Sequence, residues 1–69
     1  MYRIKDLRED RDLTQTEIAK LLNTTQQQYS KIELGKSDIS GTAIRKLAEF
    51  YNVSADYILG LIHDPKPLR

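Results

Sequence analysis

The sequence predicts an all-α protein, a single small domain of five short helices. Three observations lead to this prediction. Apolar residues recur at helical spacing in successive segments, Ser or Thr stands before most of these segments as a helix cap, and 69 residues can bury only one modest core. The domain is expected to cover residues 1–62, with a flexible C-terminal tail at residues 63–69.

The first helix is expected from Tyr2 to about Arg11, a segment that contains neither Gly nor Pro. Ile4 and Leu7 stand at i, i+3 spacing within it. They form the narrow apolar stripe that suits a surface helix.

The next stretch predicts two short helices joined by a tight turn. Thr14 has Glu17 three residues on, the spacing of a capping box that opens the first of them. Asn23 stands where the chain must turn, and Asn tolerates a left-handed backbone. Thr25 can cap the second helix, and Gly35 can end it in a left-handed cap. The apolar positions of the two helices are Ile18, Ala19, Leu22, Tyr29 and Ile32.

A loop at residues 36–39 leads to Ser40, a good cap for a fourth helix from Gly41 to about Tyr51. Gly41 weakens its first turn, at a cost of about 1 kcal/mol relative to Ala. The apolar face of this helix consists of Ala43, Ile44, Leu47, Ala48 and Tyr51.

Asn52 is expected to close the fourth helix and Val53 to fill the core beside it. Ser54 then caps a short fifth helix that extends to about Ile62. From His63 onward the chain holds two prolines and no periodicity, which predicts a loose tail.

Several motifs in the middle of the chain agree in order and spacing with one family. They are the leading Leu-Thr-Gln at 13–15, Ala19, the turn at Asn23, the capping Thr25, the Ile-Glu-x-Gly ending at 32–35 and the segment IRKLAEFYNVSADYILG up to Gly60. With them the chain resembles the Cro-repressor-type (Xre-family) helix-turn-helix proteins, a far more specific likeness than one short pattern. The string at 24–27, Thr-Thr-Gln-Gln, is similar to the start of the recognition helix in some lambdoid phage repressors. The resemblance implies a lambda-repressor-like fold with the motif at about 14–34 and the recognition helix at about 26–34.

Composition narrows the possible functions. The absence of cysteine excludes a disulfide framework and a thiolate metal site. The longest apolar stretch, near Tyr57 to Ile62, is too short to span a bilayer, and no signal peptide opens the sequence, so a cytoplasmic location is expected. The net charge of +1 predicts little non-specific affinity for DNA and a reliance on specific contacts.

No enzyme, metal site or cofactor is indicated. His63 is the only histidine, so it lacks a second His or Cys with which to hold a metal. The sequence contains no Gly-rich phosphate loop, nucleophile elbow or zinc-helix motif. We interpret the acidic side chains near the first helix as a face exposed to solvent; they are Asp6, Glu9, Asp10 and Asp12.

The residues expected to read bases stand at the start of the second motif helix. With Tyr29 and Ile32 facing inward, Gln26 and Gln27 point outward, and Lys31 lies one turn further along. A recognition helix meets base edges with its N-terminal residues, and a Gln carboxamide fits adenine N6 and N7 together. The resemblance places Gln26, Gln27 and Lys31 at the family's base-reading positions. The alternative is that the glutamines are soluble helix formers on a solvated face.

A second set of residues is expected to contact phosphate: Thr14, Gln15, Gln28, Ser30 and Lys36. In the family the helix that begins at Thr14 crosses the DNA backbone, and N–H groups at a helix N-terminus attract anions. Gln15 is the stronger candidate there, because Thr14 also serves as a cap. Gln28 lies further round its helix, toward phosphate or solvent, and Ser30 and Lys36 have a simply solvated alternative.

Arg8 and Glu33 match a pair that the family often forms between its first helix and the end of the recognition helix. The resemblance therefore implies a structural ion pair, with Arg8 as a phosphate ligand the alternative.

Two residues depart from the family pattern. Tyr29 replaces a branched aliphatic residue, so either the core accepts a ring or the hydroxyl reaches the surface toward DNA. Asp12 replaces a usual Gly, so a left-handed backbone there would be strained.

These features together predict a sequence-specific transcriptional regulator, a repressor of phage or bacterial type. Two copies would bind an inverted repeat in double-stranded DNA as a homodimer, with half-site centres about 10 base pairs apart. Leu61 and Ile62 could form a subunit contact or only close the core. The alternative function is a protein-interaction module, an antitoxin or anti-repressor, and an antitoxin that also represses its own operon would combine both. Neither a membrane nor a small-molecule substrate is indicated.

Overall fold

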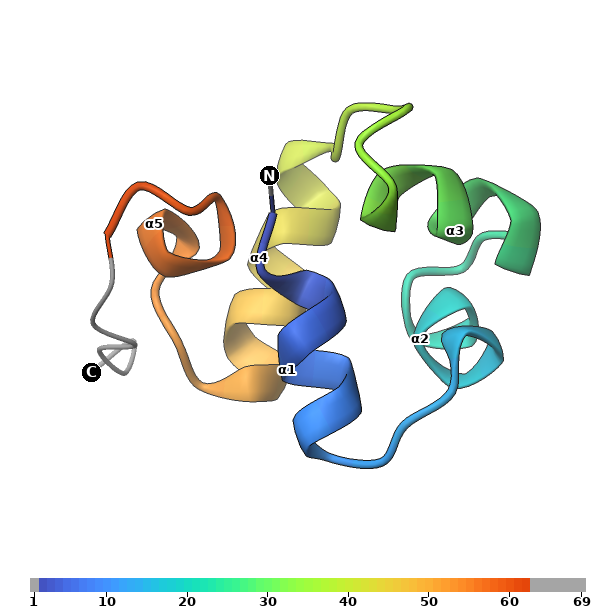
Figure 1. Ribbon diagram of the computed structural model, residues 1–69, viewed down its shortest axis with the longest axis horizontal. Helices are drawn as coiled ribbons and strands as arrows, with labels where there is room; N and C mark the ends of the chain where they lie inside the picture. The colour runs from blue at the N-terminus through green and yellow to red at the C-terminus, as the bar shows by residue number, and fades with distance from the viewer. Residues whose placement is uncertain (1, 63–69) are drawn as a thin grey trace.

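The computed structural model describes residues 2–62 of the chain (Figure 1). Over this range it contains α-helices and no strand, which confirms the predicted all-α fold. The helices are α1 (Ile4–Asp10), α2 (Gln15–Leu21), α3 (Gln26–Glu33), α4 (Gly41–Tyr51) and α5 (Ala55–Ile58). None of these helices is long and apolar enough to cross a membrane. The predicted tail at 63–69 lies outside the described residues.

Helices α2 to α5 begin as the sequence predicts, with a hydroxyl cap. The hydroxyl oxygens accept hydrogen bonds of 3.1 Å from the backbone N–H three residues on; the pairs are Thr14 with Glu17, Thr25 with Gln28, Ser40 with Ala43 and Ser54 with Tyr57. At Thr14 the Glu17 carboxylate also accepts the Thr14 N–H at 2.9 Å, which completes the capping box. Each start therefore satisfies one N–H that the helix itself cannot pair.

All five helices are followed by a residue with a left-handed backbone; these residues are Asp12, Asn23, Gly35, Asn52 and Gly60. After each of them, the next N–H bonds to a carbonyl five residues back; the pairs are Leu13 to Arg8, Thr24 to Ala19, Lys36 to Lys31, Val53 to Ala48 and Leu61 to Asp56. This closure satisfies a terminal carbonyl and reverses the chain abruptly. It explains how such short helices can follow one another so closely.

The fifth helix is shorter than predicted. It ends at Ile58 and not near Ile62, because Gly60 adopts a φ of +78°. The N–H of Gly60 bonds to the Tyr57 carbonyl at 3.0 Å and that of Leu61 to the Asp56 carbonyl at 2.9 Å. The same closure that ends the other helices ends this one. The first helix is also slightly shorter than the expected 2–11, at Ile4–Asp10.

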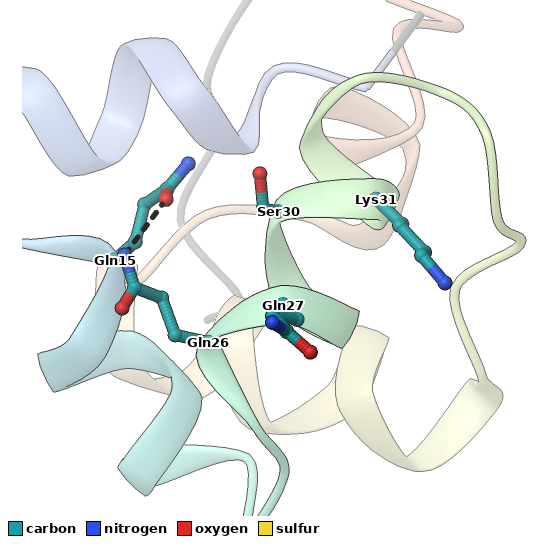
Figure 2. Close-up of a pocket in the computed structure, with 5 residues that line it drawn as sticks. All are labelled: Gln15, Gln26, Gln27, Ser30 and Lys31. Atoms are coloured by element: carbon teal, nitrogen blue, oxygen red, sulfur yellow. Dashed lines mark hydrogen bonds between the residues drawn. The ribbon is translucent and has the colours of Figure 1, made fainter.

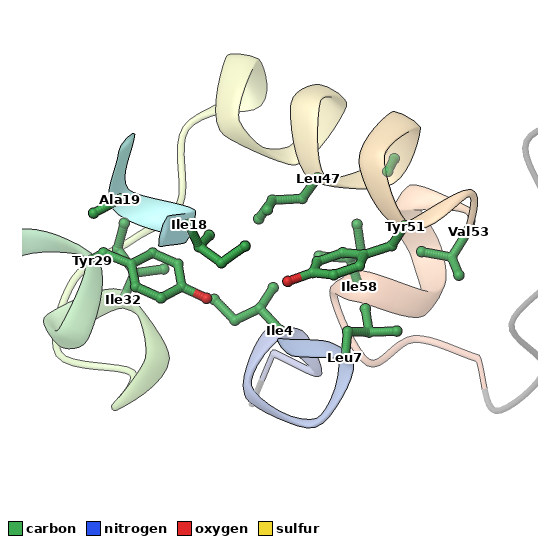
Figure 3. Close-up of a cluster of buried hydrophobic side chains, with 11 residues drawn as sticks. Ile4, Leu7, Ile18, Ala19, Tyr29, Ile32, Leu47, Tyr51, Val53 and Ile58 are labelled. Atoms are coloured by element: carbon green, nitrogen blue, oxygen red, sulfur yellow. The ribbon is translucent and has the colours of Figure 1, made fainter. Parts of the chain in front are cut away.

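The core draws on all five helices and lies between them (Figure 3). Its buried side chains are Ile4, Leu7, Ile18, Ala19, Tyr29, Ile32, Leu47, Ala48, Tyr51, Val53 and Ile58. Tyr29 is fully buried, so the core accepts the ring, and the alternative in which its hydroxyl reaches the surface is wrong. The hydroxyls of Tyr29 and Tyr51 point toward each other from α3 and α4. Within residues 2–62, neither hydroxyl meets a partner at hydrogen-bonding geometry.

Two glycines give a matched test of backbone strain. A Cβ built on Gly35 or Gly41 would meet no atom within 4 Å, so only the backbone distinguishes them. Gly41 lies in the first turn of α4, whereas Gly35 has a φ of +76°. Gly41→Ala should raise the free energy of unfolding by about 0.5–1 kcal/mol, because Ala restricts the unfolded chain. Gly35→Ala should lower it by about 1 kcal/mol. Urea denaturation measures both, and changes of the same sign would contradict this account.

Candidate nucleic-acid interface

The surface that the sequence singles out is built where the N-terminal ends of α2 and α3 meet. Thr14 and Thr25 cap these two helices, and Asn23 between them has a left-handed φ of +56° that turns the chain. Gln15 opens α2 and Gln26 opens α3. Their carboxamides are hydrogen bonded at 3.4 Å, so the two helix starts are joined through side chains.

Five of the predicted site residues line one surface pocket; they are Gln15, Gln26, Gln27, Ser30 and Lys31 (Figure 2). Gln26, Gln27 and Lys31 are exposed, while Gln15 and Ser30 are half-buried. The lining offers three carboxamides, a hydroxyl and an ammonium group, with no carboxylate among them. Such a surface can donate and accept hydrogen bonds in parallel and carries a positive charge. We call these five residues the polar pocket.

The other predicted phosphate ligands lie outside the polar pocket. The Gln28 amide donates to the Ser37 hydroxyl at 2.9 Å, and Gln28 lines a different pocket toward the start of α4. Gln28 therefore holds the loop that follows α3. Lys36 is exposed just beyond Gly35, and the Thr14 hydroxyl is occupied as the cap of α2.

Arg8 of α1 and Glu33 of α3 form an ion pair behind the polar pocket. Arg8 Nε donates to Glu33 Oε2 at 2.7 Å and Nη2 donates to Oε1 at 3.2 Å. Nη1 donates to the Leu13 carbonyl at 2.8 Å, which ties the α1–α2 connection to the same group. The two side chains are only 12% and 2% exposed, so the pair fixes α3 against α1 with little access for water.

The protonation of Glu33 follows from these contacts. Burial alone would raise the pKa of the Glu33 carboxyl, because it disfavours the charged form. Hydrogen bonds from Arg8 and Gln15, with the nearby Tyr29 hydroxyl acting in the same direction, outweigh burial and leave the pKa below its ordinary value. The carboxylate raises the pKa of Arg8 in turn. Glu33 is thus a carboxylate at neutral pH.

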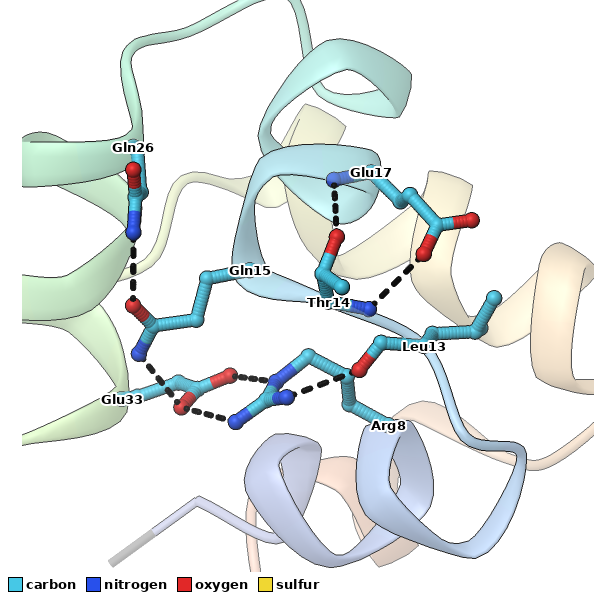
Figure 4. Close-up of polar contacts among 7 residues, drawn as sticks. All are labelled: Arg8, Leu13, Thr14, Gln15, Glu17, Gln26 and Glu33. Carbon is cyan, nitrogen blue, oxygen red and sulfur yellow. Dashed lines mark hydrogen bonds and ion pairs between the residues drawn. The ribbon is translucent and has the colours of Figure 1, made fainter.

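A chain of side-chain contacts runs from this ion pair to the polar pocket (Figure 4). Gln15 Nε2 donates to Glu33 Oε1 at 3.1 Å, and Gln26 Nε2 donates to Gln15 Oε1 at 3.4 Å. Sequence reasoning considered Gln15 only as a phosphate ligand and missed that it bridges Glu33 and Gln26. These contacts join residues 18 and 11 positions apart, and no local pattern signals them.

Over residues 2–62 there is no group of three or more His, Cys, Asp or Glu side chains that could hold a metal ion. The acidic residues Asp6, Glu9, Asp10 and Asp12 are exposed, as expected for a solvated face.

Comparison with known proteins gives the family. A family model described as Helix-turn-helix matches residues 4–58, most of the chain. Two relatives come from Bacillus subtilis (strain 168). The "Uncharacterized HTH-type transcriptional regulator YobD" is 34% identical over 65 residues, which cover 94% of this chain and 58% of the relative. The "HTH-type transcriptional regulator ImmR" is 38% identical over 58 residues, which cover 84% of this chain and 46% of the relative.

The chain thus spans about half the length of these curated relatives. No solved structure matches it significantly. The match to the family model covers all five helices, including α2, the turn at Asn23 and α3. The chain therefore belongs to the Xre-type (Cro-repressor-type) helix-turn-helix family of DNA-binding transcription regulators.

Proposed function

We propose that this domain represses transcription by binding an operator in double-stranded DNA with α3 in the major groove. The observation that carries the proposal is the exposure of Gln26, Gln27 and Lys31 on one side of α3, beside the start of α2. Recognition helices meet base edges in this way. A Gln carboxamide pairs with adenine N6 and N7, and Lys31 can reach guanine O6 and N7 or a phosphate.

The flanking residues would position the domain on the DNA backbone. Thr14 and Gln15 at the start of α2, Ser30 in the pocket and Lys36 after α3 are the proposed phosphate ligands. Gln28, which the sequence also placed among the phosphate ligands, is left out of this set, because its amide is already bonded to Ser37. With a net charge of only +1, few phosphates are neutralised, so affinity would depend on base contacts more than on charge.

Two copies of the domain would bind the two halves of an inverted repeat, with half-site centres about 10 base pairs apart. Leu61 is 70% exposed and apolar, and we propose that it contributes to the contact between copies together with Ile62. Repression would follow from occupation of promoter DNA.

The direct test selects binding sites from a random DNA pool and measures affinity for the winners at two salt concentrations. An enriched inverted repeat with adenine in its half-sites, bound far more tightly than random DNA, supports the operator proposal. Weak binding that depends only on salt, with nothing enriched, would instead favour a protein partner, as in an antitoxin or anti-repressor.

Gln27→Ala tests base reading on the selected operator. It should weaken specific binding by about 1–3 kcal/mol and leave random-sequence binding unchanged, because base contacts carry the discrimination. Gln28→Ala is the matched control: it removes the same side chain one position along, on the side that faces Ser37. Titration of both variants with operator and random DNA measures the difference. An equal loss on random DNA would contradict base reading by Gln27.

A further inference from the structure

The chain of hydrogen bonds that runs from Arg8 to Gln26 has only one possible polarity, that is, only one direction in which its members can donate and accept. Arg8 carries donors alone, and the ionised Glu33 carboxylate carries acceptors alone. Glu33 therefore receives from Arg8 on one side and must also receive from Gln15, whose Nε2 donates to Oε1 at 3.1 Å. This leaves Gln15 Oε1 facing Gln26, which must present its own Nε2, as it does at 3.4 Å. The charge on Glu33 thus dictates the orientation of both carboxamides.

The orientation of Gln26 decides what it offers to DNA. With one Nε2 hydrogen directed at Gln15, the second hydrogen and Oε1 remain for a base. Adenine requires a donor for N7 and an acceptor for N6, at fixed relative positions. Reversal of the carboxamide would exchange its donor and acceptor and no longer match adenine in the same place.

We propose that Glu33 is a positioning residue for base recognition, which holds the Gln26 carboxamide, through Gln15, in the orientation that reads adenine. The inference rests on the proposed DNA-reading function and adds a specificity role to a side chain that is only 2% exposed. Because water hardly reaches Glu33, no solvent molecule can readily replace the contact to Gln15 and relax the orientation.

Glu33→Gln reverses the polarity while it keeps the shape. The new carboxamide has a single oxygen, and we expect it at the Oε2 position, where it keeps the shortest contact, that from Arg8 Nε at 2.7 Å, although its NH₂ group then also faces Arg8 Nη2. Its NH₂ group then faces Gln15, which must turn to accept, and Gln26 must turn in response. The measurement is the ratio of affinities for two operators that carry adenine or guanine at the base pair read by Gln26. This ratio should fall at least about fivefold, toward guanine, which presents acceptors only at O6 and N7.

A charge-swap variant provides the rescue. In the double variant Glu33→Gln/Gln15→Glu, the new carboxylate at position 15 accepts from both neighbours, so Gln26 returns to its original orientation. The adenine-to-guanine ratio should then recover to within about twofold of wild type, although the carboxylate nearer the DNA lowers affinity for every sequence. The ratio cancels that uniform loss. A ratio that stays low in the double variant would overturn the proposal.

Arg8→Lys separates positioning from stability. It weakens the ion pair and lowers the melting temperature but leaves the Glu33 carboxylate to receive from Gln15, so the ratio should not change. Equal losses of the ratio in Arg8→Lys and Glu33→Gln would mean that general loosening, not polarity, is responsible. If Glu33→Gln does not fold, Gln15→Met breaks the same chain without touching the ion pair, and an unchanged ratio there overturns the inference.

The adenine-to-guanine affinity ratio of the wild-type protein distinguishes a failure of base reading by Gln26 from a failure of the positioning role of Glu33. A wild-type ratio near one, at every base pair of the selected site, would reject base reading by Gln26 and with it the proposed function of this face. A clear wild-type preference that persists in both Glu33→Gln and Gln15→Met would reject only the role of Glu33.

Discussion

Glu33→Ala is expected to lower the free energy of unfolding by about 3–5 kcal/mol. The change leaves the Arg8 guanidinium, 12% exposed, without the carboxylate that accepts two of its hydrogen bonds. It also removes the acceptor of the Gln15 amide. A domain of this size has about 3–10 kcal/mol of stability in total, so the loss is a large fraction of it. Urea denaturation and the melting temperature measure the effect.

Two controls accompany this prediction, one at an exposed acid of α1 and one at the ion pair itself. Glu9→Ala removes an exposed acid of α1 and should change stability by less than about 0.5 kcal/mol. The double variant Arg8→Met/Glu33→Leu removes both charges and should cost less than the sum of the two single changes, because no unpaired charge stays buried. An unaltered melting temperature in Glu33→Ala would refute the structural role.

Glu33 should also make the free energy of unfolding depend on pH in the acidic range. Because the pKa of Glu33 is lower in the folded than in the unfolded protein, its contribution to stability is present above the ordinary carboxyl pKa. That contribution is lost as the pH falls through the lowered folded-state pKa. The stability difference between wild type and Glu33→Ala should therefore shrink as the pH is reduced below about 4.5.

Local chemistry explains why so much of the fold could be predicted from the sequence. A cap such as Ser40 requires only a hydroxyl and an N–H three residues on, and a turn such as Asn23 requires only a residue that tolerates positive φ. Both are properties of neighbours along the chain. The end of α5 was predictable by the same rule, because Gly60 is the kind of residue that ends a helix, yet the helix expected from the sequence extends to about Ile62.

The candidate site was predictable only in part, because its contacts depend on how helices pack. The outward direction of Gln26 and Gln27 followed from the helical repeat and the inward Tyr29. The pairing of Arg8 with Glu33, 25 positions apart, was expected only because the chain resembles a family. No pattern predicted that Gln15 would join Glu33 to Gln26 or that Gln28 would turn to Ser37. Such contacts form only once α1, α2 and α3 are placed in space.

The second large effect is expected in alkaline solution, at Tyr51 of α4. The residue is 2% exposed, and its hydroxyl meets no hydrogen-bond partner within residues 2–62. Burial raises the pKa of Tyr51 to about 12, although the guanidinium groups of Arg11 and Arg8 act against it. In the unfolded chain a tyrosine releases its proton near pH 10. The folded protein must therefore keep a proton that the unfolded chain has already lost.

The sign of the effect follows directly. Stability from this residue is fully present below pH 10 and is lost as the pH rises from about 10 to about 12, by about 1.4 kcal/mol per pH unit. Tyr51→Phe removes the titration of this hydroxyl. The free energy of unfolding of the variant, measured by urea denaturation, should therefore fall by about 2–3 kcal/mol less than that of wild type over that interval.

At neutral pH the same variant should be as stable as wild type or more stable, by up to about 1 kcal/mol. Phe keeps the ring that packs against Phe50 and lies under the Arg11 guanidinium, and it removes only a buried hydroxyl without a partner. A clear loss at pH 7 would mean that the hydroxyl makes a stabilising contact in solution, and the alkaline prediction would then lose its basis. The buried hydroxyl of Tyr51 is thus expected to destabilise the folded protein, and the measurement at pH 7 tests the premise of the alkaline prediction.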